Sequence, residues 1–361
     1  MRFSATDAIS PAFEHTKRQL FRPFRLGQWI RLAVVGLLAG ELSSGGWNGN
    51  RFSNLRHPGT GTEHLSIPSF GGIDPMLIAG LIAVVVFTAF VLGILLMYIS
   101  SVMRFILFDS VLAKECRIRE GWSRRQGPGV RYFLWKILYT LAMFGGLIVL
   151  VGIPAAFAFA MGWLSDPKQH VAPLVLCGIA LVLAVMAFAI AMAVIFVLTK
   201  DFVVPQMALE NISAFEGWSR LWTMMKAEKG SYAGYIGMKI VLAIVAGIIF
   251  GILGFIVVLI ILIPAAGVAV AAVLGGKAAG LGWTAATITL AVVAGCVLVA
   301  IFLFVVALIS VPVIVFFPAY SIYFFAARYQ PLSSALYSPT PAPQAPPGTS
   351  PPLPPAPAPA G

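Results

Sequence analysis

The chain has 361 residues, of which 60% are hydrophobic and only 10% are charged, and its mean hydropathy is +0.94. A soluble domain needs about 25% charged residues to cover its surface, so this composition excludes a soluble globular protein and indicates a protein of the lipid bilayer. The formal net charge of +11 would indicate nucleic-acid binding only if the bases gathered in a polar domain. The sequence has no such domain, so we expect no nucleic-acid partner.

The first 25 residues are basic but contain no continuous apolar core, so they lack the pattern of a cleavable signal peptide. After them the hydropathy predicts six membrane spans, because about 20 apolar residues cross the hydrocarbon core of a bilayer. No charge interrupts the spans Met76–Met103 and Ala172–Thr199, among others. The predicted spans are residues 26–43, 76–103, 132–163, 172–199, 232–264 and 285–325.

Basic residues divide unevenly between the two sides of these spans. Of the 24 Lys and Arg, four fall on the side opposite the N terminus, which leaves 24 − 4 = 20 on the N-terminal side. The acidic residues divide 9 and 4 when Glu41 is counted at the outer end of the first span. Cytoplasmic loops are enriched in Lys and Arg, so both termini are predicted to be cytoplasmic in a prokaryotic cytoplasmic (inner) membrane.

A charged pentapeptide with a tryptophan, EGWSR, occurs twice, at Glu120–Arg124 and Glu216–Arg220. The sequence AFEHTKR at Ala12–Arg18 is a weaker echo of it. In each copy a glutamate precedes an arginine by four positions, which is the spacing of an ion pair on a helix. The pattern therefore predicts a helix at each of the three places.

The three predicted helices are amphipathic, with apolar and aromatic side chains on one face and bases on the other. This is the pattern of a helix that lies in the headgroup layer of a membrane. We expect Arg124 and Arg220 to face anionic phospholipid. We expect Trp122, Trp218 and Trp222 to anchor the helices at the interface.

Each copy of the motif is followed by a hydrophobic hairpin. We therefore predict an all-α integral membrane protein with six transmembrane helices in three parallel repeats, each an interfacial amphipathic helix plus a transmembrane hairpin. The repeats span approximately residues 8–103, 104–199 and 200–328, within a single transmembrane domain of residues 1–330. Residues 331–361 are rich in Pro and Ala and are predicted to form a disordered cytoplasmic tail.

Prolines and glycines mark the breaks that we expect in these helices. The sequence Gly127-Pro128-Gly129 is predicted to end the second interfacial helix. Pro154 and Pro264, each in a copy of IPAA, are predicted to kink or end their spans. After the sixth span, the aromatic stretch FFPAYSIYFFAARY predicts a fourth, truncated interfacial segment.

A basic residue stands about one turn into three of the spans, at Arg31, Lys136 and Lys239. If the three units pack around a pseudo-threefold axis, these cations would meet at headgroup depth and form a pocket for a phospholipid headgroup or another anion. In the alternative interpretation each side chain reaches the interface separately from a lipid-facing position, as bases at the inner ends of spans ordinarily do.

The sequence offers no set of residues for a known reaction. The middles of the spans lack Asp, Glu and His, which argues against ion-coupled transport and intramembrane proteolysis. There is no P-loop, GxSxG or HExxH motif, and His57, Glu63 and His64 lack the spacing of a tetrahedral metal site. We therefore predict no catalytic residue, no metal and no cofactor.

Two stretches link the predicted elements in a distinctive order: PFRLGQWIRLAVVGLLAG opens the first span, and MRFILFDSVLAKECRIREGWSR follows the second. This order resembles that of a group of prokaryotic multi-pass proteins related to the membrane domain of glycerophosphoryl diester phosphodiesterase. The resemblance covers roughly residues 5–330 and implies a membrane module. The soluble catalytic barrel of that phosphodiesterase has no counterpart here, so no catalytic residue carries over.

The sequence thus favours a non-enzymatic integral membrane protein that binds anionic lipid through its interfacial helices and serves in lipid organisation or as a membrane scaffold. A protein partner or a homo-oligomer is compatible with this role. The first alternative is an uncoupled transporter of a small molecule or lipid, with a central pathway between the three repeats. The second is a lipid-modifying enzyme that uses the three cations with Asp109 or Asp201.

Overall fold

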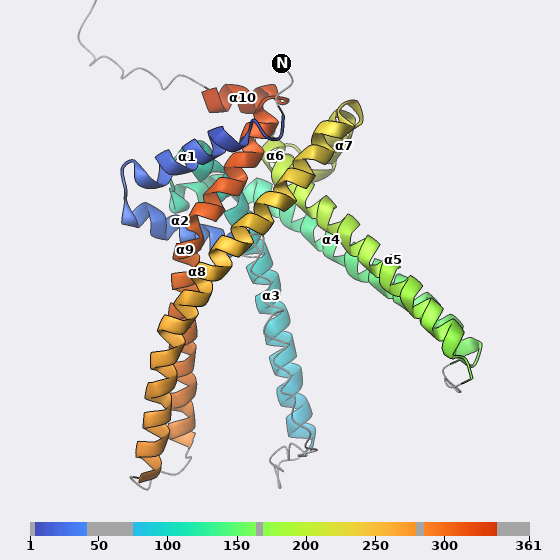
Figure 1. Ribbon diagram of the computed structural model, residues 1–361, viewed down its shortest axis with the longest axis vertical. Coiled ribbons are helices and arrows are strands. Elements are labelled where there is room, and N and C mark those ends of the chain that lie inside the picture. Colours follow the sequence, from blue (N-terminus) through green and yellow to red (C-terminus); the bar gives the residue numbers. More distant parts are fainter. Residues whose placement is uncertain (1–3, 42–74, 164–168, 279–284, 338–361) are drawn as a thin grey trace, which may run out of the picture.

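A computed structural model describes residues 4–41, 75–163, 169–278 and 285–337 (Figure 1). These residues form helices and connecting turns, and none of them lies in a β-strand. In chain order the elements are α1 (Ile9–Phe21), α2 (Leu26–Ala39), α3 (Pro75–Leu112), α4 (Ile118–Ala160), α5 (Val171–Leu198), the π-helical turn η3 (Thr199–Val203), α6 (Val204–Glu210), α7 (Ala214–Ala227), α8 (Lys229–Ala278), α9 (Ala285–Ala326) and α10 (Gln330–Tyr337).

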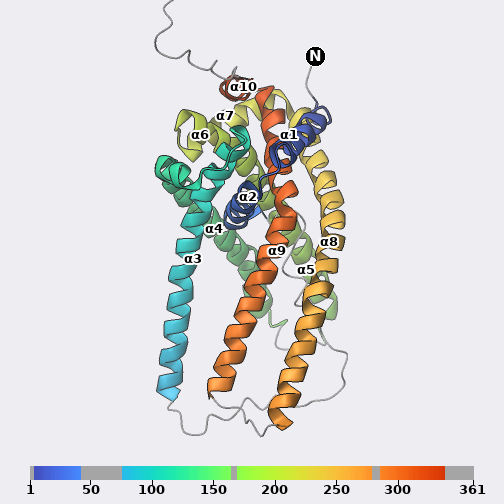
Figure 2. The same cartoon turned by 90° about the vertical axis from the view of Figure 1, so that its left-hand side faces the viewer.

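Five of the helical stretches are long and apolar enough to cross a membrane, so the chain is a multi-pass membrane protein. They correspond to the second to sixth predicted spans. In Figure 1 the α4–α5 pair and the α8–α9 pair lean away from each other, with α3 between them. Figure 2 shows α3, α8 and α9 running toward the same end of the molecule. The five stretches are Ile82–Leu112, Ile118–Ala160, Val171–Glu210, Lys229–Gly267 and Thr289–Ala326.

The first predicted span, residues 26–43, is not found as a membrane-crossing helix. Its helix α2 has 14 residues, which at 1.5 Å per residue is about 21 Å, against roughly 30 Å for the hydrocarbon core. α2 ends at Gly40, which has a left-handed φ of 78°. The next residue, Glu41, is buried against Arg104 and Lys200, so it lies beside two bases of the N-terminal side and not on the opposite side, where the charge count placed it. Residues 42–74 lie outside the described residues.

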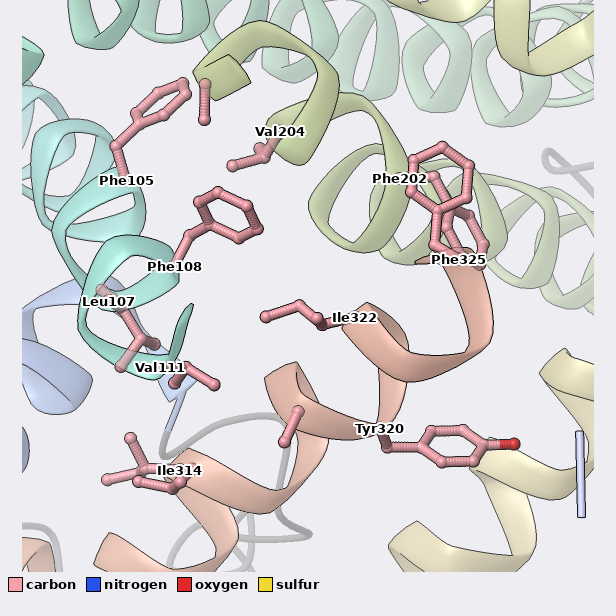
Figure 3. Packing of buried hydrophobic residues seen from close by; sticks show 14 of the residues in the cluster. Phe105, Leu107, Phe108, Val111, Phe202, Val204, Ile314, Tyr320, Ile322 and Phe325 are labelled. Carbon is pink, nitrogen blue, oxygen red and sulfur yellow. The ribbon is translucent and has the colours of Figure 1, made fainter. Parts of the chain in front are cut away.

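The buried core gathers at one end of the long helices (Figure 3). There Phe108 of α3, Val204 of α6 and Ile322 of α9 point toward one another, and each is at most 5% exposed. Toward the other end the side chains are exposed, and no more than 11% of the most apolar window of any span is buried. In a bilayer this surface meets lipid tails, which are as apolar as the side chains, so little drives the spans together.

The chain enters the two EGWSR helices in the same way. A residue with a left-handed backbone, Lys114 (φ 59°) or Asn211 (φ 57°), precedes each of them. The glycine of the motif then packs tightly on the preceding span. A Cβ on Gly121 would lie 3.1 Å from an α3 side chain, and one on Gly217 would lie 2.8 Å from an η3 side chain. The glycine therefore lets the motif helix approach the end of the span.

Three prolines at expected helix breaks lie inside continuous helices, so Pro128 does not end its helix and Pro154 and Pro264 do not end their spans. α4 continues through Pro128 and Pro154, and α8 continues through Pro264. Pro128 is buried, and beside it a Cβ on Gly129 would lie 2.7 Å from Val102 of α3. Packing against α3 therefore holds this part of α4 together. Farther along, a helix that ended in hydrocarbon would leave backbone polar groups without partners, which favours continuing the helix past Pro154 and Pro264.

The end of the described chain is helical where a tail was predicted to begin. α10 packs against α9 and α6, and its Leu332 is fully buried. The aromatic stretch FFPAYSIYFFAARY, residues 316–329, lies mostly within α9, and α10 follows directly after it. The fourth interfacial segment stays a prediction. Residues 338–361, the rest of the predicted tail, lie outside the described residues.

α1 is held against the core by His15, which occupies the position of the motif glycine in its copy. The ring of His15 contacts the carbonyl oxygen of Val111 through Nε2 (2.9 Å) and the hydroxyl of Tyr323 through Nδ1 (3.2 Å). Burial lowers the pKa of His15, and the nearby cations Lys114 and Arg18 lower it further. The neutral imidazole is therefore the form that fits this site.

Acidification should weaken the packing of α1. Because the pKa of His15 is lower in the folded protein than its usual 6.5, the folded state binds fewer protons, and its stability falls as the pH drops through 6.5 toward the folded value. Between about pH 7.5 and about pH 5.5, we expect the melting temperature in detergent to fall less for His15→Gln than for the unmodified protein. An equal fall in both proteins would contradict this role of His15.

A side chain at the motif glycine should destabilise the protein. Gly217→Leu forces a side chain against Val203, and overpacking of this kind costs about 1–3 kcal/mol. Gly237→Leu in α8 is the matched control, because nothing lies within 4 Å of a Cβ there. Thermal melts followed by tryptophan fluorescence should give a lower midpoint for Gly217→Leu than for Gly237→Leu, and equal midpoints would show that the close contact does not matter.

Candidate functional site

Five charged residues from four parts of the chain meet in the core end of the molecule. Glu41 follows α2, Arg104 lies on α3, Lys200 and Asp201 lie on η3, and Lys239 lies on α8. All five are at most 9% exposed. Buried Lys, Arg, Asp and Glu are rare unless they are paired, so this charge network is the first candidate site.

The carboxylate of Glu41 is the centre of one half of the network. It accepts hydrogen bonds from the guanidinium of Arg104 on one oxygen and from the ammonium of Lys200 on the other. A second nitrogen of Arg104 donates to the carbonyl oxygen of Ala39 at 2.6 Å, at the C-terminal end of α2. Cations are stabilised at a helix C terminus, where carbonyl groups lack partners within the helix. These bonds tie α2 to α3 and η3.

Asp201 is the centre of the other half. One of its oxygens accepts hydrogen bonds from the ammonium of Lys239 and from the hydroxyl of Tyr235, the latter at 2.9 Å. The ring of Tyr235 stacks on Tyr320 of α9 with centroids 5.2 Å apart. Asp201 therefore joins η3 to α8 and, through the stacked rings, to α9.

The π-helical turn η3 presents two consecutive charged residues, Lys200 and Asp201, to the interior. A π turn inserted in an α-helix is uncommon and is frequent at functional sites. A side chain from the motif helix steadies it, because Nε1 of Trp218 donates to Oγ1 of Thr199 at 3.0 Å. The second EGWSR copy thus supports the turn that carries two of the five charges.

The network is built to hold helices together and leaves little room for a ligand. It contains three cations and two carboxylates, so its formal charge is 3 − 2 = +1. The cavity beside Glu41, Arg104 and Asp201 has a volume of about 20 Å³, which holds about one water molecule. An organic substrate does not fit there.

The three cations predicted to share a pocket have three different partners. Lys239 is buried and paired with Asp201. Lys136 is half-buried, and its ammonium donates to Oγ of Ser100 at 3.1 Å. Arg31 is exposed, with its guanidinium 3.5 Å from the carbonyl oxygen of Cys116.

The arginines of the two EGWSR copies also differ. Arg220 donates to Glu216 at 2.7 Å, as the spacing of four predicts, and to Glu210 as well. Arg124 is exposed and has no carboxylate partner among the residues described, because Glu120 instead accepts from Arg117 at 3.5 Å. Arg124 is therefore available to a ligand, whereas Arg220 is occupied by its own chain.

Of the three predicted anchors, Trp222 is 54% exposed and lies under the ammonium of Lys226, 5.6 Å from its ring centroid. Trp122 is half-buried and meets Tyr98 edge to face at 6.2 Å. Trp218 is also half-buried and is bound to η3. Trp222 is thus the most exposed of the three, while Trp122 and Trp218 pack against the core.

A basic and aromatic surface surrounds the turn between α1 and α2. Its apolar part consists of Phe21, Phe24 and Leu26, which are 53%, 58% and 58% exposed. Arg22 and Arg25 are exposed between them and have no carboxylate partner in the described part of the chain. We call these five residues the basic elbow. Exposed rings next to unpaired arginines are typical of a segment at the boundary between headgroups and acyl chains.

The sequence interpretation missed Arg104 and Lys200 as parts of a site. A signal was available, since each stands 16 residues before the glutamate of an EGWSR copy: 120 − 104 = 16 and 216 − 200 = 16. Their shared partner Glu41 could not be found in this way. It lies 63 residues from Arg104 and 159 residues from Lys200, and no copy of the motif contains it.

Breaking the network should cost far more than breaking a surface pair. Asp201→Asn leaves the buried Lys239 without a carboxylate, which costs about 3–5 kcal/mol. Asp201→Asn combined with Lys239→Met should recover part of that loss, because no unpaired charge remains. Glu14→Gln, which breaks an exposed pair with Arg18, should cost at most about 1 kcal/mol. Detergent-melting midpoints test this order, and a double variant no better than Asp201→Asn would contradict it.

Comparison with known proteins gives one match. Residues 3–334 match the model of a family described as a family of unknown function, DUF7544. No curated protein and no solved structure matches the chain. The match shows no link to glycerophosphoryl diester phosphodiesterase, although it fits the expectation of an uncharacterised membrane family. Because the matched residues cover nearly the whole chain, this protein belongs to the DUF7544 family.

Proposed function

We propose that this protein is a non-enzymatic integral protein of a cytoplasmic membrane, which binds anionic phospholipid at its core end and thereby organises lipid or supports a partner protein. The observation that carries the proposal is the basic elbow, where exposed aromatic rings alternate with arginines that have no carboxylate partner among the described residues. Each such base near an anionic membrane surface contributes about 1 kcal/mol of binding.

The distribution of charge supports a single basic face. Of the described Lys and Arg, only Lys277 lies at the far end of the long helices, near the end of α8. The others lie on the core end or on the segments that cover it, with both ends of the described chain (Figure 1). By the positive-inside rule this end faces the cytoplasm.

The repeated entry into the motif helices supports the three-unit architecture as part of the same proposal. The second and third units share a left-handed residue, a close glycine contact and a base 16 positions before the motif. In the first unit the hairpin would comprise α3 and α2, which is shorter than the five candidate spans. We propose three units of common origin, of which the first has lost or shortened one span.

Transport has less support. A pathway needs polar side chains enclosed between helices at mid-bilayer depth. In the described spans the apolar windows are at least 89% unburied (100 − 11 = 89), so the spans enclose little there. The enzyme alternative has one favourable contact, the Asp201–Lys239 pair. Asp109 forms an ion pair with Arg125 at 2.7 Å instead of facing the three cations. The cavity beside the charge network is too small for a substrate.

Removing the unpaired arginines should reduce binding of anionic lipid. The triple variant Arg22→Gln, Arg25→Gln and Arg124→Gln should bind phosphatidylglycerol roughly a hundredfold more weakly, since three bases contribute about 1 kcal/mol each. Native mass spectrometry of the full chain with added lipid measures this, with phosphatidylcholine as the neutral reference. Lys277→Gln, at the far end, is the control and should have little effect. Equal lipid retention by all three proteins would overturn the proposal. Arg220 is unsuited to this test because its replacement also breaks contacts within the protein.

A further inference from the structure

A pocket separate from the charge network lies between α2 and the first turn of α4. It has a volume of about 400 Å³ and is lined by Arg31, Arg117, Ile118, Arg119 and Glu120. We propose that this arginine pocket binds a phosphomonoester, the terminal phosphate of a lipid headgroup or free phosphate. The inference rests on the proposed function for its lipid form, and it names the site and the headgroup chemistry.

The charge of the lining fits a doubly charged anion. Three arginines and one glutamate give 3 − 1 = +2, and a phosphomonoester carries about −1.5 to −2 near neutral pH. The neighbouring pocket, of about 230 Å³, provides an internal comparison. Its charged lining consists of two arginines and three carboxylates, or 2 − 3 = −1. The two pockets share Arg117 and Glu120, and of the two the arginine pocket has the lining charge that suits a phosphate.

The arginine side chains are suited to this ligand and are not all used by the protein. Guanidinium groups bind phosphate oxygens in a planar, bidentate manner that an ammonium cannot reproduce. Arg119 has no ion-pair partner in the part of the chain that the structure describes, and Arg31 contacts only a backbone carbonyl there. Arg117 is oriented by Glu115 at 3.1 Å and by Glu120 at 3.5 Å.

Direct hydrogen bonds connect the two walls of the pocket. Nε2 of Gln28 on α2 donates to the carbonyl oxygen of Lys114 at 2.7 Å. The guanidinium of Arg31 donates to the carbonyl oxygen of Cys116 at 3.5 Å. Both acceptors lie in the connection between α3 and α4. A site held in this way loses less conformational entropy when it binds than one built on free side chains.

The position of the pocket suits a lipid. Arg31 stands five residues after Leu26, the last member of the basic elbow, on the same helix. The exposed Phe24 and Leu26 offer apolar surface to acyl chains, and the pocket offers cations to the headgroup. A lipid offers acyl chains to the elbow and a phosphate to the pocket, whereas inorganic phosphate offers a group to the pocket alone.

The test compares two double variants of the full chain with equal loss of charge. Arg31→Gln with Arg119→Gln removes two pocket arginines, and Arg22→Gln with Arg25→Gln removes two elbow arginines. Native mass spectrometry gives the affinity of each protein for phosphatidate, a phosphomonoester, and for phosphatidylglycerol, a phosphodiester. We expect the pocket variant to lose about tenfold or more in affinity for phosphatidate relative to phosphatidylglycerol, and the elbow variant to weaken both lipids equally. Melting midpoints confirm that both variants are folded.

The remaining outcomes separate this inference from the proposed function. If each double variant loses the same affinity for phosphatidate as for phosphatidylglycerol, the arginine pocket has no headgroup preference. That result overturns the inference and leaves the proposed binding of anionic lipid intact. If the unmodified protein binds neither lipid better than phosphatidylcholine, the proposed function fails and the pocket has no lipid ligand. In the last experiment, excess inorganic phosphate is added to the protein with bound phosphatidate. If the phosphatidate is displaced, free phosphate is a sufficient ligand. If it is retained, the lipid is the ligand of the pocket.

Discussion

The structure depends on two buried carboxylates, Glu41 and Asp201, that hold cations from remote parts of the chain. Glu41 brings the end of α2 to Arg104 and Lys200, and Asp201 brings α8 to η3 through Lys239. Removing a charge from such a network is costly because the remaining partner stays buried and unpaired. The core end therefore keeps its arrangement even though the α4–α5 pair, α3 and the α8–α9 pair diverge beyond it (Figure 1).

The bilayer explains why the protein is tightly packed at one end only. In water an exposed row of Leu, Ile, Val and Phe would drive the helices together. In hydrocarbon, exposing the same side chains costs no hydrophobic free energy. The spans of Figure 1 can thus diverge, and specific packing is needed only where the chain leaves the acyl region. At that level aromatic rings, glycine contacts and ion pairs hold the helices together, and the surface there carries the arginines that we propose bind lipid.

Hydropathy predicted the all-helical class and five of the six spans. A long uncharged run such as Ala172–Thr199 can satisfy its backbone hydrogen bonds in a membrane by forming a helix across it. The spacing of four correctly predicted the Glu14–Arg18 and Glu216–Arg220 pairs, at 3.6 and 2.7 Å. It failed for Glu120, since Arg117, one turn earlier in the chain, is nearer.

The first span was not confirmed, and hydropathy could not foresee this because it counts apolar residues and does not detect partners. Leu26–Ala39 is apolar enough for a membrane, yet it is short, and Glu41 is bound to two bases far away in the sequence. The sequence predicted only one residue of the arginine pocket. Arg31 was proposed as an anion ligand, but in a pocket shared with Lys136 and Lys239. Its actual neighbours, Arg117 and Arg119, come from another helix, and only the three-dimensional fold shows that the segments meet.

The continuity of α4 has a mechanical consequence. The unbroken helix α4 joins the first EGWSR copy to the apolar stretch that can cross the membrane, so a tilt of the α4–α5 pair is transmitted to the motif. After the second copy the helix breaks at Glu228, between α7 and α8, and a tilt of α8 can be absorbed there. A bilayer of different thickness, which changes the tilt of its helices, would thus load the contacts that hold the arginine-bearing start of α4 on α3, whereas the break at Glu228 separates α7 from a tilt of α8.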